Sequence, residues 1–266
     1  MADAALNSPS ITTARAARRR LTINHWATDI SDLEIGIMPT TQHRAKSDQF
    51  TKDMDVLGDV REDGRRVGVV AYRMDPWRET TGMRRRLIFK LFSDTMNWRA
   101  TMEMTVGRSL QLTMGAGGTP VTAYAVNLSR QEQIVQFERS ADKWWFFPEK
   151  FSFFLDVDGA AQFYTLRQAM FSIGADYILY DGRGRRIGYI DGKLISVGGV
   201  WHVELLEQQQ NTALADVLQL FCAMLKFNKS ARSHIRRLAK DVAAGRVETS
   251  LDHHEKDLYS NPRRRR

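Results

Sequence analysis

A repeat in the second half of the chain restricts the fold more than any other feature of the sequence. Residues 170–174 read MFSIG, and residues 194–198, 24 positions later, read LISVG. Tyr177 and Trp201 occupy equivalent positions after the two copies. Apolar residues at alternating positions, with glycine at the corners of a short period, are typical of stacked β-hairpins. The repeat therefore predicts β structure over 164–206.

Related patterns extend this prediction upstream. KLFS at 90–93 precedes Trp98, as KLIS at 193–196 precedes Trp201. Asp63-Gly64 and Asp181-Gly182 are predicted hairpin turns, because glycine tolerates the positive φ that such turns need. Further strands are predicted at 110–114, 121–126, 134–138, 144–147 and 151–156. Short strands at this spacing favour a mainly β barrel or sandwich, and a closed barrel has no exposed strand edges.

Residues 213–227, ALADVLQLFCAMLKF, are predicted to form a helix inside the barrel. Twelve of the fifteen are apolar, and Asn211 or Thr212 can cap the helix. A helix that is apolar nearly all round must be buried. Its length of roughly 22 Å is less than the ~30 Å hydrocarbon core of a bilayer, so membrane insertion is the less favoured alternative. A second, basic helix is predicted from Ser230 to Ala244, ended by Gly245.

These patterns divide the chain into five segments. We predict a disordered basic tail at 1–20, an irregular lead-in at 21–53 with one strand at 33–37, a barrel with its central helix at 54–227, a basic helix at 228–245, and a disordered Arg-rich tail at 246–266.

The formal net charge of +8 is unevenly distributed. Residues 1–20 carry +3 and 226–266 carry +7, whereas 21–225 carry −2. Basic ends suit a polyanion such as anionic lipid, nucleic acid or an acidic protein, although they also raise solubility. The single cysteine excludes an intramolecular disulfide and is consistent with a reducing compartment. Without a secretory signal or a run of 18 apolar residues, we expect a cytoplasmic protein, peripheral to the membrane if it binds lipid.

The segment RQAMFSIGADYILYDGRGRRIGYIDGKLISVGGVWHVEL, at 167–205, resembles the LURP-one-related family. That family is grouped with the phospholipid scramblases and the Tubby C-terminal domain. The resemblance is good over 161–227 and weaker over 54–160. It implies a closed Tubby-like barrel of about a dozen strands around one apolar C-terminal helix. It also implies binding of phospholipid headgroups or a scramblase-like role, but Tubby's phosphoinositide-binding residues and the scramblase calcium segment have no counterpart here.

No catalytic, metal or cofactor motif is recognisable. Gly182-x-Gly184-x-x-x-Gly188 has the wrong spacing for a dinucleotide fingerprint and is followed by a predicted strand. GAGG at 115–118 lacks the Gly-Lys-Ser/Thr of a P-loop. The six histidines show no metal-ligand spacing with Cys222, which lies in the apolar helix, where a thiolate is disfavoured. We therefore expect a protein that is not an enzyme and needs no cofactor.

Two basic segments are candidates for binding. The first is the loop 74–86, MDPWRETTGMRRR, whose indole could lie among headgroups while its guanidiniums contact phosphates. The candidate lipid-headgroup residues are Trp77, Arg78, Arg84, Arg85 and Arg86; the alternative is an ordinary solvated hairpin. The second is the predicted basic helix, with Arg232, Arg236, Arg237 and Lys240 as candidate polyanion contacts. The aromatic run KWWFF at 143–147 is interpreted as a covered central strand.

The predicted function is therefore peripheral binding of anionic phospholipid headgroups, or a scramblase-like role. Nucleic-acid binding through the basic tails and the 230–244 helix is the first alternative, although the slightly acidic body and the lack of interleaved aromatic residues disfavour it. A protein-interaction scaffold with an unidentified partner is the second.

Overall fold

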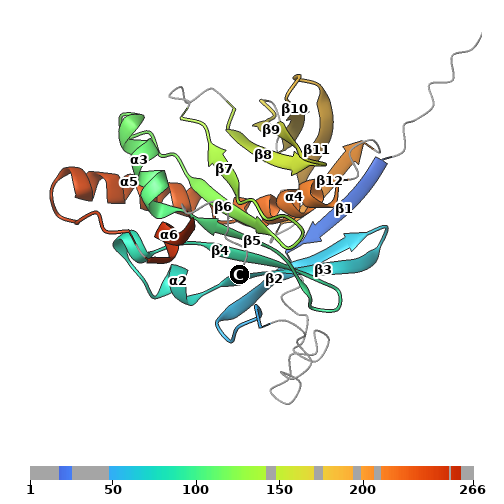
Figure 1. The fold of residues 1–266 in the computed structure, drawn as a ribbon, viewed down its shortest axis with the longest axis horizontal. Coiled ribbons are helices and arrows are strands. Elements are labelled where there is room, and N and C mark those ends of the chain that lie inside the picture. Colours follow the sequence, from blue (N-terminus) through green and yellow to red (C-terminus); the bar gives the residue numbers. More distant parts are fainter. Residues whose placement is uncertain are drawn as a thin grey trace, which may run out of the picture.

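The computed structural model describes residues 18–25, 48–141, 148–170, 176–193, 199–206, 211–251 and 253–258. In these ranges twelve antiparallel strands form a closed barrel (Figure 1). The strands are β1 (Arg18–Asn24), β2 (Met54–Glu62), β3 (Arg65–Arg73), β4 (Ile88–Ser93), β5 (Trp98–Met104), β6 (Ala123–Leu128), β7 (Val135–Arg139), β8 (Lys150–Val157), β9 (Ala160–Gln168), β10 (Tyr177–Asp181), β11 (Arg186–Lys193) and β12 (Val200–Leu206). Strands from β2 to β12 pair in sequence order, and β1 closes the barrel between β12 and β2. The predicted mainly β, closed-barrel fold is confirmed.

The wall of the barrel follows the alternation seen in the sequence. In β12, Trp201, Val203 and Leu205 are buried, while His202 and Glu204 between them are half-buried on the outside. Asp63 and Gly64 connect β2 to β3 with φ of 49° and 81°, which is the backbone that the predicted hairpin turn requires. Residues 171–174 of the first repeat copy, the whole second copy at 194–198, and the predicted strands at 33–37 and 144–147 lie outside the described residues.

The central helix α4 (Thr212–Leu225) runs inside the barrel, as predicted. Asn211 caps it by accepting a hydrogen bond from the backbone N–H of Ala213, at 2.8 Å. The Phe221 ring lies 5.6, 5.1 and 5.0 Å from those of Phe137, Phe151 and Tyr177, which come from β7, β8 and β10. Asp216, on another part of the helix surface, pairs with Arg99 of β5. α4 therefore contacts strands on different sides of the barrel, and its apolar side chains form the barrel core.

The barrel begins earlier than the predicted boundary at residue 54. β1 spans Arg18–Asn24 and crosses the predicted tail and lead-in. Its inward side chains, Leu21 and Ile23, are 1% and 0% exposed. The interpretation of these residues as tail and lead-in was therefore wrong. Two apolar residues next to an arginine run are too weak a pattern to predict a strand, and the partner strand β12 lies about 180 residues away.

The predicted strand at 110–114 is also wrong. These residues belong to helix α3 (Val106–Gly115) in the connection between β5 and β6. The buried residues of α3 are Val106, Ser109, Leu110 and Thr113, and this spacing of three, four and seven is helical rather than alternating. Ser109 and Thr113 are the buried positions that a search for apolar residues overlooks.

The C-terminal segment is partly ordered, contrary to the predicted disordered tail at 246–266. It forms helix α6 (His253–Leu258). Glu255 is 4% exposed and accepts hydrogen bonds from the backbone N–H groups of Gly107 and Arg108, at 2.8 and 3.2 Å, at the start of α3. Leu258 packs on Ala125 and Ile134 of the barrel wall. The segment therefore folds back and caps α3.

The two ends of the barrel differ. α2 (Asp75–Arg78) and the 3-10 helix η3 (Gly82–Arg84) connect β3 to β4, and α5 (Asn228–Ala243) follows α4. These elements gather with α3 and α6 at one end, on the left in Figure 1, which we call the helical end. The opposite end, where β2 turns into β3 and β10 into β11, we call the turn end.

Candidate anion-binding face

Helix α5 carries a continuous row of cations on its outer side. Its buried side chains include Ala231, Ile235 and Leu238. Lys229, Arg236, Arg237 and Lys240 are exposed and are separated by seven, one and three residues, which places them on one face. We call these four residues the α5 stripe. The only acidic residue of α5, Asp241, pairs with Arg246 at 2.6 Å rather than with the stripe.

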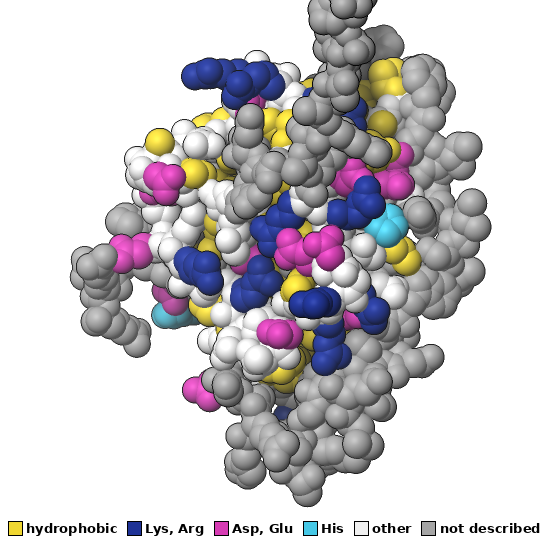
Figure 2. Space-filling view, turned by 90° about the vertical axis from the view of Figure 1, so that its right-hand side faces the viewer, with side chains coloured by type: hydrophobic (Ala, Val, Ile, Leu, Met, Phe, Trp, Pro, Cys, Tyr) yellow, Lys and Arg dark blue, Asp and Glu magenta, His cyan; other side chains and the backbone are white. Residues whose placement is uncertain are grey.

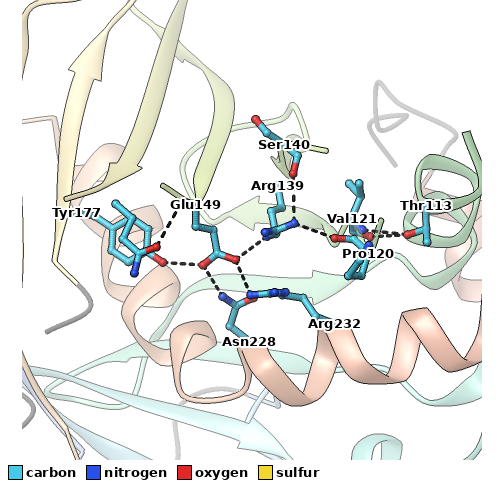
Figure 3. Close-up of polar contacts among 10 residues, drawn as sticks. Thr113, Pro120, Val121, Arg139, Ser140, Glu149, Tyr177, Asn228 and Arg232 are labelled. Atoms are coloured by element: carbon cyan, nitrogen blue, oxygen red, sulfur yellow. Dashed lines mark hydrogen bonds and ion pairs between the residues drawn. The ribbon is translucent and has the colours of Figure 1, made fainter. Parts of the chain in front are cut away.

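A buried polar network attaches α5 to the barrel (Figure 3). Glu149, next to β8, accepts hydrogen bonds from Arg139 Nε at 2.5 Å and Arg232 Nη1 at 3.1 Å through Oε1. Its Oε2 accepts from Asn228 Nδ2 at 2.7 Å and from the Tyr177 hydroxyl at 2.8 Å. Burial and the adjacent Glu149 carboxylate raise the pKa of Tyr177, so the hydroxyl keeps its proton and donates. Four donors on one carboxylate hold the start of α5 against β7, β8 and β10.

This network corrects one predicted polyanion contact. Arg232 faces the barrel and bonds to Glu149, with a third of its side chain exposed. Arg236, Arg237 and Lys240 are exposed as predicted, and Lys229 joins them on the same face. The prediction counted cations without assigning them to helix faces. Arg232 is three residues from Lys229 and four from Arg236, a spacing that is also compatible with the outer face, so the sequence does not identify which side meets the barrel.

Trp77 is a core residue rather than a membrane anchor. It is 6% exposed, and its ring lies edge-on to those of Phe227 and His234, at 6.5 and 6.0 Å. The guanidinium of Arg85 lies over the same indole, 4.3 Å from the ring centroid. The indole fills the space between the barrel end and α5, because burying so large an apolar surface is favourable. Its predicted role among lipid headgroups is therefore wrong.

The four loop arginines take different positions. Arg86 is 16% exposed and pairs at 3.0 Å with the buried Glu103 of β5, so it faces inward. Arg78 and Arg84 are exposed, with Arg78 4.0 Å from Asp55. Arg85 is half-buried on Trp77. The loop thus presents Arg78, Arg84 and part of Arg85 to solvent.

His234 joins the two predicted segments. Its buried ring packs edge-on against Trp77 of α2. Burial and the nearby charges of Arg85 and Arg237 lower its pKa to about 4, so the ring is neutral at pH 7. Nothing in the sequence singled out His234, because its partners lie about 150 residues upstream. The contact places the loop, which carries Arg78, Arg84 and Arg85, beside the helix that carries the α5 stripe.

The turn end has a different charge pattern. Figure 2, which looks at the right-hand side of Figure 1, shows dark blue and magenta side chains interspersed. Arg20 pairs with Glu204 and Arg185 with Asp181, each at 2.8 Å. A cavity of about 540 Å³ opens here at the start of α4, and its wall includes Arg130, Asp156, Asp158 and Asp216. Mixed charge at this end contrasts with the net positive helical end.

Other kinds of site find no support in the described residues. No cluster of three or more His, Cys, Asp or Glu side chains in the described ranges could hold a metal ion. Burial raises the pKa of the Cys222 thiol, which disfavours a thiolate nucleophile. Within the same part of the chain, no helix combines the length and the apolar character needed to cross a membrane. Comparisons of the chain with protein-family models, curated proteins and solved structures found no match.

Proposed function

We propose that the protein is a peripheral binder of anionic phospholipid surfaces, and that the helical end is the contact face. The observation that carries this proposal is the α5 stripe beside the α2–η3 loop. Residues 75–86 hold four basic and two acidic residues, and 226–246 hold seven basic and one acidic. The Trp77–His234 contact packs these two segments against each other. The resemblance to the LURP-one-related family points to the same class of ligand, and a scramblase-like role remains part of that resemblance.

The physical basis of the contact is electrostatic. A Lys or Arg near an anionic membrane surface contributes about 1 kcal/mol, and the attraction falls off within a Debye length. With Trp77 buried, the described part of this face has no exposed aromatic anchor. Attachment should therefore be salt-sensitive, and it should depend on the number of cations that reach the surface together.

A vesicle co-sedimentation experiment tests the proposal. We expect vesicles containing phosphatidylserine to recruit the protein and neutral phosphatidylcholine vesicles not to. Replacing Arg236, Arg237 and Lys240 together by Ala should cost about 3 kcal/mol, roughly a 150-fold loss of affinity. The matched control replaces Arg65, Arg66 and Arg183, three exposed arginines near the turn end, and should change the affinity less than threefold.

Two results would count against lipid binding. Equal losses in the two triple variants would show that only net charge matters and that the helical end is not the contact face. Recruitment to duplex DNA or RNA but not to anionic vesicles, lost in the α5 variant, would assign the stripe to nucleic acid.

A further inference from the structure

Three neighbouring strands surround a cavity on the outer wall of the barrel. The cavity has a volume of about 380 Å³, which is within the range of small-ligand sites. The described residues that line it are Arg20 and Thr22 of β1, Tyr189 and Asp191 of β11, and His202 and Glu204 of β12. Arg20 is exposed and the other five are half-buried. None of them belongs to the loop or the helices of the helical end.

The register of the strands explains why these side chains meet. Residues that pair across β12 form two rows. One row is Thr22, His202 and Asp191, and the other is Arg20, Glu204 and Tyr189. His202 and Glu204 are two positions apart on β12, so both rows face the same side of the sheet. Residues opposite each other on neighbouring strands have Cβ atoms about 4.5–5.5 Å apart, which is close enough to contact one ligand together.

Two contacts hold the rows in place before a ligand arrives. The Thr22 hydroxyl lies 3.1 Å from Nδ1 of His202. Arg20 donates through Nε and Nη2 to one carboxylate oxygen of Glu204, at 3.1 and 2.8 Å. Side chains that are already oriented lose less conformational entropy when a ligand binds. The cavity wall is therefore partly preorganised for hydrogen bonding.

Tyr189 supplies an aromatic wall whose position is fixed. Its hydroxyl donates to Oδ2 of Asp176 at 2.7 Å, and Oδ1 of Asp176 accepts from the backbone N–H of Gly192 at 3.0 Å. Burial and the Asp176 carboxylate raise the pKa of Tyr189, so the hydroxyl keeps its proton and the side chain stays neutral. The Arg186 guanidinium lies over the ring, 5.2 Å from its centroid. An aromatic ring held in this way offers an apolar surface to a ligand.

A second cavity continues the first along β11 and β12. Its volume is about 220 Å³, and it shares Tyr189 and Glu204 with the first. Ile187 and Leu206 are part of its wall, so it is less polar than the first. Cavities that share two side chains form one groove, which we call the outer groove.

Charge balance in the outer groove favours a neutral ligand. Among the described residues, two arginines, Arg20 and Arg186, and two acids, Asp191 and Glu204, line it, so their formal charges cancel. No hydrogen bond or ion pair within the described ranges engages the half-buried Asp191 carboxylate, which can therefore accept donors from a ligand. Hydroxyl groups both donate and accept, so neighbouring hydroxyls of a sugar can satisfy a carboxylate and a guanidinium at once.

We propose that the outer groove binds a neutral pyranose. The C–H face of the sugar ring lies on Tyr189, one pair of hydroxyl groups donates to Asp191, and another hydroxyl accepts from Arg20. Arg186 lines only the second cavity, so it does not stand between Tyr189 and the first. A soluble glycan and the headgroup of a glycolipid share this ring chemistry. The inference does not rest on the proposed membrane contact, because the two use different residues.

An NMR titration of the whole chain tests the sugar site. The probes are the methyl glycosides of glucose, galactose, mannose and N-acetylglucosamine. We expect at least one of them to move the ring signals of His202 and the backbone signal of Asp191. Glucose 6-phosphate should bind no more tightly than glucose, because the groove has no excess of cations.

Variants at Tyr189 test the stacking contact. Tyr189→Ala should lower the affinity for the bound glycoside roughly tenfold, whereas Tyr189→Phe keeps the ring and should change the affinity less than threefold. The matched control is Phe154→Ala, which removes an aromatic side chain that is 59% exposed on β8, outside the groove, and should leave the affinity unchanged. Cooperative melting is the check that each variant folds.

A vesicle experiment distinguishes the two sources of the sugar. Phosphatidylcholine vesicles carry a lipid whose headgroup is the glycoside that binds best. Recruitment that is lost in Tyr189→Ala would identify a glycolipid, and glycoside binding without recruitment would identify a soluble glycan. Tyr189→Ala should leave recruitment to phosphatidylserine vesicles unchanged, so the failure of either proposal is visible without the other.

Three results would overturn the sugar site. In the first, none of the four glycosides moves the His202 and Asp191 signals. In the second, Tyr189→Ala and Phe154→Ala lower the affinity equally. In the third, glucose 6-phosphate or spermidine binds more tightly than every glycoside, which would assign the outer groove to a charged ligand.

Discussion

Replacing Glu149 by Ala should destabilise the protein far more than a typical loss of an ion pair. The Glu149 and Arg139 side chains are 9% and 11% exposed, so the substitution leaves the buried charge of Arg139 without a carboxylate, and only the backbone carbonyl groups of Pro120 and Ser140 still accept from its guanidinium. Breaking a buried pair in this way costs roughly 3–5 kcal/mol. Arg232 adds less, because a third of its side chain reaches solvent and water screens its charge. We expect a loss of about 3–4 kcal/mol.

Thermal unfolding followed by circular dichroism measures this loss. For a domain of this size, each kcal/mol lowers Tm by roughly 2–4 °C, so Glu149→Ala should lower Tm by roughly 6–16 °C. The matched control is Glu138→Ala on β7, which removes a 3.0 Å pair with Arg108 whose partners are 32% and 36% exposed. An exposed pair contributes at most about 1 kcal/mol. If the two variants shift Tm equally, the Glu149 network is not what attaches α5 to the barrel.

Three further predictions concern the fold. Leu220→Asp would bury an unpaired charge inside the barrel and should abolish cooperative unfolding, since a domain's stability is only about 5–15 kcal/mol; an unchanged Tm would show that α4 is not the core. A chain that starts at Arg18 should melt cooperatively, whereas one that starts at Trp26 lacks β1 and should not; equal melting curves would contradict the closure of the barrel by β1. Burial raises the pKa of Glu255 above its unfolded value, so the stability that this residue contributes decreases as pH rises through the folded pKa. Glu255→Gln keeps an acceptor for α3 and should match or exceed the parent Tm at pH 7, while Glu255→Ala should lose about 1–2 kcal/mol of stability. The reverse order of the two variants would refute the capping role.

The sequence was sufficient for the features that depend on local patterns. Alternation around Val203 and the turn at Asp63-Gly64 predict hairpins, and the apolar circumference around Leu220 predicts an enclosed helix. β1 and α6 were missed because their stability comes from distant partners: Leu21 is buried only when β12 and β2 lie beside it, and Glu255 is buried only against α3. Local composition around Arg18 and Glu255 is that of a tail.

The candidate site shows the same division. Basic residues in the loop and in the helix were recognisable as two separate groups, and four of the nine predicted residues, Trp77, Arg85, Arg86 and Arg232, face the protein wholly or in part. Which cations face outward depends on Trp77 packing on His234 and on Arg232 reaching Glu149. Both are contacts between residues that lie more than 80 positions apart, and no single-sequence pattern reports them.

Site-specific fluorescence tests the central claim, that the helical end meets the membrane, most directly. The chain has one cysteine, Cys222, which is fully buried, so a cysteine placed on the surface can be labelled selectively. Ser233 is exposed beside the α5 stripe, and Ser129 is exposed in the turn between β6 and β7 at the turn end. With an environment-sensitive dye on Ser233→Cys, phosphatidylserine vesicles should shift the emission to shorter wavelength, and the same dye on Ser129→Cys should be unaffected. A shift at residue 129 without one at residue 233 would contradict the account.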